Sequence, residues 1–144
     1  MCVSVITKQF KPNNKIVKGY KVIRVNQNDP KFTTSDTLFP IKMDQWLKAE
    51  ADYGSCGKGP ISRLTDNYGK VYPWGFHIWA TRHAAKEWAN FKLNWTKTIK
   101  IVPVIGKDVR VVGKQKNFKL YVCKHLFVKT PKDTHSYVKE PKMY

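Results

Sequence analysis

The hydrophobic positions of this chain fall into short β-favouring runs that are interrupted by polar stretches containing Pro, Gly or Asn. The first two runs cover residues 2–10 and 16–25, and the stretch 11–15 between them contains Pro12 and a pair of Asn residues. Proline fixes one backbone angle and asparagine tolerates left-handed geometry, so this stretch favours a turn. The N-terminal pattern therefore predicts an opening β-hairpin.

Two helices are predicted, each after a residue that is suited to cap it. Asp44 precedes a predicted short helix over 45–51, which follows a predicted short strand over 37–42. Thr81 precedes a second predicted helix over 82–90, in which small and aromatic residues recur at the sequence spacing of one helix face. The predicted packing positions of that helix are Ala85, Trp88 and Ala89.

The second half of the chain predicts an antiparallel meander. Its predicted strands are residues 76–80, 99–105, 108–112 and 118–128, with a tight Gly106-Lys107 turn and a lysine-bearing loop over 113–117. Together with the opening hairpin and two short helices, this pattern predicts an α+β fold with a mixed, mainly antiparallel sheet. We expect a single domain over 1–128 and a basic C-terminal tail over 129–144.

Residues 52–75 combine five glycines, two prolines and four aromatic side chains, without a clear strand or helix pattern. A structureless connection of this length is unusual inside a compact domain and tends to be functional. The stretch is therefore the first candidate site, and Lys58 could add charge to an anion-binding nest of backbone N–H groups there. The alternative is a surface loop that its aromatic side chains hold in place.

The net charge of the chain indicates which class of partner it can bind. The 144 residues include 27 Lys and Arg but 10 Asp and Glu, which gives a formal net charge of +17. Such an excess favours an anionic partner, although lysines spread as a solvated shell are the alternative. Lysine greatly outnumbers arginine. Because the arginine fork reads base edges in pairs and the lysine ammonium does not, sequence-specific recognition of a duplex is disfavoured.

Metal, disulfide and catalytic chemistry find little support in the sequence. The three cysteines, Cys2, Cys56 and Cys123, are far apart and have neither C-x-x-C nor zinc-finger spacing. Paired carboxylates at short spacing are also missing, so general acid–base catalysis is disfavoured and no cofactor is expected. With no long apolar run and no signal-peptide pattern, we expect reduced thiols, a cytoplasmic location and no membrane partner.

One segment carries a resemblance to known proteins. Gly75-Phe76-His77 is followed by Ala84 and Trp88, and then by valine-rich strands that include residues 102–104 and 108–113. This resembles a group of small phage and bacterial proteins with a G-[FL]-H strand, a helix and a meander, and is similar to one half of ADP-ribosyltransferase-like folds. That enzyme family uses a glutamate on a late strand, whereas residues 118–128 contain no acid. The resemblance therefore implies a pocket that binds a nucleotide but does not catalyse the transferase reaction.

Basic and aromatic residues interleave in the second half of the chain, a mixture that suits single strands or nucleotides. Trp79 and Trp88 are expected in the core, and Trp74, Trp95 and Tyr121 as exposed stacking platforms. The leading hypothesis is non-catalytic binding of nucleic acid or a nucleotide by a small basic phage-type accessory protein. The alternatives are a phage inhibitor that binds an acidic surface of a host defence complex, and an ADP-ribosyltransferase-like enzyme. The predicted binding residues are Lys58, Arg63, Tyr72, Trp74, His77, Arg82, Arg110, Lys119 and Tyr121.

Overall fold

A computed structural model describes residues 3–25, 32–34, 40–49, 63–92, 98–129 and 138–139 of the chain. This part contains eleven strands and one helix. The elements are β1 (Val5–Gln9), β2 (Ile16–Val25), β3 (Phe32–Thr34), β4 (Pro40–Ile41), β5 (Trp46–Lys48), β6 (Arg63–Thr65), β7 (Val71–Pro73), β8 (Phe76–Trp79), α1 (Arg82–Lys92), β9 (Thr98–Gln115), β10 (Phe118–Val128) and β11 (Val138–Lys139).

The predicted α+β class with two helices is wrong, because the described chain is mostly sheet and has one helix. The segment predicted as the helix 45–51 contains β5 instead, which pairs antiparallel with the end of β10. Pairing with an existing sheet edge has overridden the local helix signal there. The second predicted helix is present as α1, and the Thr81 side chain accepts the N–H of Ala84 at 3.1 Å, as a helix cap does.

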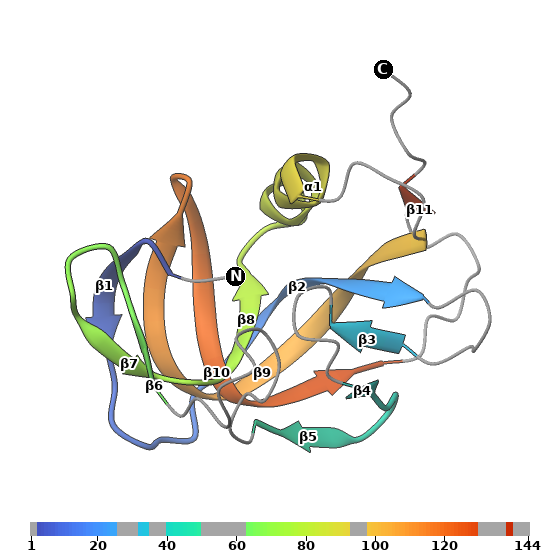
Figure 1. Cartoon of the computed structure of the whole chain (residues 1–144). Coiled ribbons are helices and arrows are strands. Elements are labelled where there is room, and N and C mark those ends of the chain that lie inside the picture. Colours follow the sequence, from blue (N-terminus) through green and yellow to red (C-terminus); the bar gives the residue numbers. More distant parts are fainter. Residues whose placement is uncertain are drawn as a thin grey trace.

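The long strand β9 organises the sheet (Figure 1). Its first half pairs with β2, and its second half pairs with β10 and β1. The predicted opening hairpin is therefore wrong in its pairing: β1 and β2 both exist, but each pairs with β9. The predicted Gly106-Lys107 turn is also wrong, since β9 runs through both residues without a break. The chain reverses at Lys116 and Asn117, within the predicted loop over 113–117, although residues 113–115 belong to β9. The positive φ angles of Lys116 and Asn117, 50° and 66°, suit a two-residue hairpin turn.

The pairings of β9, β10, β8 and β2 form a closed circuit. β10 pairs with β8 through residues 120–123, and β8 returns to β2 through the pair Tyr20 and Trp79. Gly106 lies on the inner side of this circuit, where an added Cβ would lie 2.6 Å from Cys123 Sγ and 2.6 Å from Ile78 Cδ1. The backbone can approach this closely because glycine has no side chain. Gly106, which the sequence suggests as a turn residue, therefore lies inside β9 and allows the neighbouring strands to approach closely.

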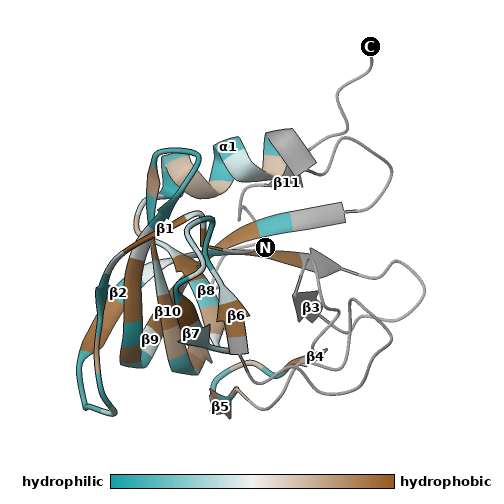
Figure 2. Cartoon of the chain, turned by 60° about the vertical axis from the view of Figure 1, so that its left-hand side comes forward, coloured by the Kyte–Doolittle hydropathy of each residue, from teal (hydrophilic) through white to brown (hydrophobic). Residues whose placement is uncertain are grey.

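Two hydrophobic clusters lie on the two sides of these strands. The inner cluster contains Phe76, Ile78, Val104, Cys123 and Leu126. The other cluster lies under α1, which buries Ala84, Ala85, Trp88 and Ala89 against Trp79, so the predicted core positions of Trp79 and Trp88 are confirmed. Figure 2 shows hydrophobic and hydrophilic residues alternating around α1, as expected for a helix with one buried face.

The candidate loop over 52–75 is only partly described. Its last part forms the hairpin β6–β7, and the Asp66 carboxylate fixes the turn by accepting the backbone N–H groups of Tyr68 and Lys70 at 2.8 and 2.9 Å. Asp66 also accepts the N–H of Ile6 in β1 at 3.2 Å. The hairpin thereby covers the edge of β1, so this stretch is not structureless where it is described.

Two further findings concern the ends of the fold. Within the predicted tail 129–144, β11 pairs with residues Ile99 and Lys100 of β9. Among the described helices, none combines the length and the apolar character needed to cross a membrane.

Candidate functional site

Three of the predicted binding residues are buried in the core. Tyr72, Trp74 and His77 are 1%, 6% and 7% exposed. The Tyr72 hydroxyl accepts the N–H of Val3 at 3.0 Å, and the Trp74 carbonyl accepts a hydrogen bond from Lys124 Nζ at 2.8 Å. The expectation that Trp74 is an exposed stacking platform is wrong, because its ring packs against Phe76 inside the protein.

His77 is held as a neutral core residue. Its burial, together with the positive charge of Lys21, lowers the pKa of the imidazole to about 3. Lys21 Nζ donates to the carbonyl of His77 at 2.8 Å, and the ring of Tyr72 meets the imidazole edge-on at 6.2 Å. Among the described residues, no group hydrogen-bonds to its Nε2 atom. A side chain enclosed in this way has no access to a ligand in solvent.

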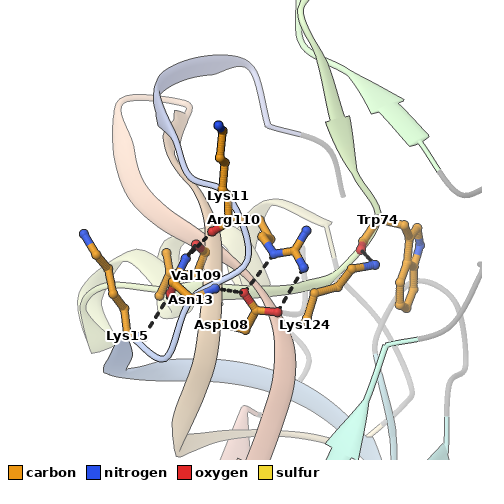
Figure 3. A network of polar contacts seen from close by, with 8 residues as sticks. All are labelled: Lys11, Asn13, Lys15, Trp74, Asp108, Val109, Arg110 and Lys124. Atoms are coloured by element: carbon orange, nitrogen blue, oxygen red, sulfur yellow. Dashed lines mark hydrogen bonds and ion pairs between the residues drawn. The ribbon is translucent and has the colours of Figure 1, made fainter.

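Arg110 belongs to a structural ion pair (Figure 3). Its Nε and Nη2 atoms donate to the two carboxylate oxygens of Asp108 at 2.8 and 3.0 Å. The same carboxylate accepts the N–H of Asn13 at 3.0 Å, which fixes the connection between β1 and β2. Burial opposes the charge of Asp108, but the hydrogen bonds from Arg110 and Asn13 outweigh it and lower the pKa of this carboxyl. Arg110 therefore already has an anionic partner within the fold.

The remaining predicted residues occupy separate places. Arg82 and Lys119 are exposed, and Tyr121 is half-buried with Lys119 Nζ 5.4 Å from its ring centroid. Lys58, Trp95 and the side chain of Arg63 lie outside the described residues. The structure thus brings together Tyr72 with His77 and Lys119 with Tyr121, but it does not gather the predicted residues into one site.

A different group of residues shares the outward side of β2, β9, β10 and β5. Residues directly opposite one another in antiparallel strands project from the same face of a sheet. The registers align one row that consists of Lys18, Ile105, Phe127 and Trp46, and a second row that consists of Ile16, Lys107, His125 and Lys48. These two rows, together with Tyr20, Pro103 and Lys129, are called the outer face below. The alternate residues Gly19, Val104 and Val128 are buried, so the strands separate core from surface cleanly.

The outer face holds aromatic and cationic side chains in contact. The rings of Trp46 and Phe127 are 5.5 Å apart, and Lys107 Nζ lies 5.8 Å from the centroid of the Trp46 ring. Trp46 is 46% exposed, whereas Trp74, Trp79 and Trp88 are all buried. Nearly half of Trp46 is therefore open to solvent, and an exposed indole is a side chain on which planar rings stack.

A groove runs along this face. It has a volume of about 470 Å³, within the usual size range of small-molecule sites. Its lining includes Lys18, Tyr20, Pro103, Ile105, Phe127 and Lys129. The lining of the groove is thus mainly carbon, and it also includes two exposed lysines.

The charges on the outer face have one sign. Its eleven residues include four lysines and no acid. In the part of the chain that the structure describes, Lys18, Lys48 and Lys129 form no ion pair or hydrogen bond with their side chains. Lysines without internal partners next to open aromatic rings can neutralise an anion while its apolar part packs on the face.

The described thiol and carboxylate groups near this face are buried or engaged by the fold. Burial, together with the charge of Asp108, raises the pKa of the Cys123 thiol to about 12, so the thiolate is not available. Asp66 and Asp108 are both engaged by hydrogen bonds that hold the fold. Within the described ranges, no three His, Cys, Asp or Glu side chains lie close enough to hold a metal ion.

Comparisons of the chain with protein-family models, curated proteins and solved structures found no match. The resemblance to phage and bacterial proteins and to ADP-ribosyltransferase-like folds therefore stays a prediction.

Sequence reasoning did not identify the outer face, although part of its signal is present. Ile16, Lys18 and Tyr20 alternate with core residues, and so do Pro103, Ile105 and Lys107. The decisive information is which strands are neighbours. Pairing β2 with β9 and β5 with β10 depends on the tertiary fold, and the predicted turn at residues 106–107 and helix at 45–51 concealed both pairings.

Proposed function

We propose that this protein binds a nucleic acid without acting on it chemically, and that the outer face is the binding surface. The observation that carries the proposal is the row of Lys18, Ile105, Phe127 and Trp46 across four adjacent strands, flanked by further lysines. A cationic track beside stacking rings is what a polyanion with planar bases requires.

The balance of charge favours this class of partner over a neutral one. The chain carries +17, and the lysines of the outer face have no acidic neighbour among its residues. Neutralising a phosphate releases a counterion, so every lysine that contacts the sugar-phosphate backbone of the nucleic acid increases the affinity at low salt. Lysine ammonium groups act as point charges, which suits binding that does not depend on sequence.

The test is the binding of a fluorescently labelled oligothymidylate, followed by anisotropy over a series of salt concentrations. We expect binding that weakens steeply as salt rises. The variant Lys18→Glu/Lys48→Glu should weaken binding by roughly tenfold or more at low salt, because it places two carboxylates beside the phosphates of the bound oligonucleotide. The control Lys11→Glu/Lys114→Glu changes the net charge equally at two exposed positions that do not belong to the outer face and should have a much smaller effect.

Two results would contradict the proposal. One is the lack of any binding at low salt. The other is competition by poly-glutamate as strong as competition by an unlabelled oligonucleotide, which would point to an acidic protein surface as the partner instead.

A further inference from the structure

The groove on the outer face differs chemically from the lysines around it. Its lining includes the carbon-rich side chains of Tyr20, Pro103, Ile105 and Phe127, which we take as its floor, and the exposed residues Lys18 and Lys129, which we take as its rim. A nucleic acid has two chemically distinct parts, the charged backbone and the planar bases. Either the phosphates or the bases of a bound nucleic acid could occupy the groove.

A phosphate deep in the groove would lose water and meet few hydrogen-bond donors, because beyond the Tyr20 hydroxyl the side chains of Pro103, Ile105 and Phe127 offer none. Proline has no backbone N–H, and the pairings of β9 with β2 on one side and β10 on the other use the backbone groups around Ile105. Burying a charged group without hydrogen-bond donors is costly. The floor therefore disfavours phosphate, and the ammonium groups that suit phosphate stand at the rim instead.

A base fits the floor on the same grounds. Its faces are apolar enough to pack on Ile105 and Phe127, and it can stack on the open indole of Trp46 at the end of the same row. Adjacent strands lie about 4.8 Å apart, so the row across four strands is roughly 15 Å long and has room for more than one base.

We propose, on the basis of the proposed function, that the outer face binds a single strand with its bases turned inward onto the groove and Trp46 and its phosphates outward toward Lys18, Lys48 and Lys129. The ligand class is thus single-stranded nucleic acid. In a duplex the bases stack on one another and cannot present their faces to the protein.

The experiment compares two oligonucleotides of equal length and charge, an oligothymidylate and its fully abasic counterpart. We expect the abasic strand to bind about tenfold more weakly or worse, because the stacking of each base contributes to affinity. Trp46→Leu should weaken binding of the oligothymidylate by about tenfold and leave binding of the abasic strand nearly unchanged. Tyr68→Leu is the matched control, since Tyr68 is 77% exposed in the β6–β7 turn, away from the outer face, and should change neither affinity.

Tryptophan fluorescence gives a second measurement that does not depend on the affinity of a variant. Stacking on Trp46 should quench the emission when the oligothymidylate binds, and the quench should be largely lost in Trp46→Phe. A duplex of the same length should bind more weakly than the single strand at matched salt.

The outcomes separate this inference from the proposed function. If the abasic strand or the duplex binds as tightly as the oligothymidylate, the bases do not enter the groove and the inference is overturned, while nucleic-acid binding stands. If no oligonucleotide binds at low salt, both the inference and the proposed function fail.

Discussion

Individual glycines let the strands approach closely enough to close their circuit. Gly19 lies where β2 crosses β8, and an added Cβ would meet the carbonyl oxygen of Trp79 and the side chain of Ile78. A backbone carbonyl in a paired strand cannot move away easily, so added volume there must distort the crossing. The closure of the sheet therefore depends on the lack of a side chain at this position.

Replacing Gly19 tests this dependence. Gly19→Ala should lower the free energy of unfolding by about 1–3 kcal/mol, the usual cost of overpacking a tightly packed site. Urea denaturation measures the change. Lys18→Ala, at the exposed neighbouring position, should stay within about 0.5 kcal/mol of the wild type, and an equal loss in both variants would contradict the argument.

Asp108 combines an unusual backbone conformation with a partly buried charge. Its φ angle is 59°, and its carboxylate is held by Arg110 and by the N–H of Asn13. Asparagine tolerates the same left-handed conformation, so Asp108→Asn removes the charge without adding backbone strain. At neutral pH the variant should be less stable by about 1–2 kcal/mol, since it loses charge-assisted hydrogen bonds.

The pH dependence of this loss has a definite sign. The pKa of Asp108 is lowered below its usual value of 3.8 in the folded state, so the charge stabilises the fold above the unfolded pKa. That contribution disappears as the pH falls through the folded pKa. The difference between wild type and Asp108→Asn should therefore be constant from about pH 7 to 5 and shrink below about pH 4. Glu87→Gln, at an exposed position of α1, is the control and should show a smaller difference.

At the scale of elements, the residues of the hairpin turn between β9 and β10 are not the most stable choice for its backbone conformation. Lys116 and Asn117 both adopt positive φ angles, which cost lysine more than asparagine or glycine. Lys116→Asn/Asn117→Gly places the preferred pair in this turn and should raise the free energy of unfolding by about 0.5–1 kcal/mol. Thermal unfolding measures the gain. Lys114→Asn removes the same charge from an exposed strand position, and it should give no gain.

Local signals predicted some elements well. The strand predicted over 118–128 has the same bounds as β10, and the helix after Thr81 was predicted to within two residues. Both carry their signal within the segment itself, as a dense β-favouring run and as a cap followed by Ala and Trp at helical spacing. The helix at 45–51 failed because β10 provides a partner for β5, and no local feature of Trp46 reveals that partner.

The site was harder to predict than the elements for the same reason. Aromatic side chains such as Trp74 and Tyr72 resemble binding residues in the sequence, yet the fold buries them. Trp46, in contrast, is exposed because its strand is added to the outside of the sheet next to Phe127. Composition gives only the net positive charge of the chain, whereas the strand order shows which lysines and rings share a face.

At the scale of the whole molecule, the net charge of +17 could act in two ways. A general positive field would attract a polyanion to any part of the surface, whereas a localised site would concentrate the contacts on the outer face. The slope of log affinity against log salt separates these cases, because it counts the phosphates that are neutralised.

Two variants of equal net charge decide between them. Replacing the four lysines of the outer face, Lys18, Lys48, Lys107 and Lys129, by glutamine should reduce the salt slope for a single strand by about 2, since each of the three proposed phosphate contacts contributes about 0.7. Replacing Lys11, Lys70, Lys86 and Lys114, which are exposed and lie elsewhere, should leave the slope nearly unchanged. Equal reductions in both variants would show that the charge acts as a diffuse field, because a localised site predicts a loss only where the phosphates make contact.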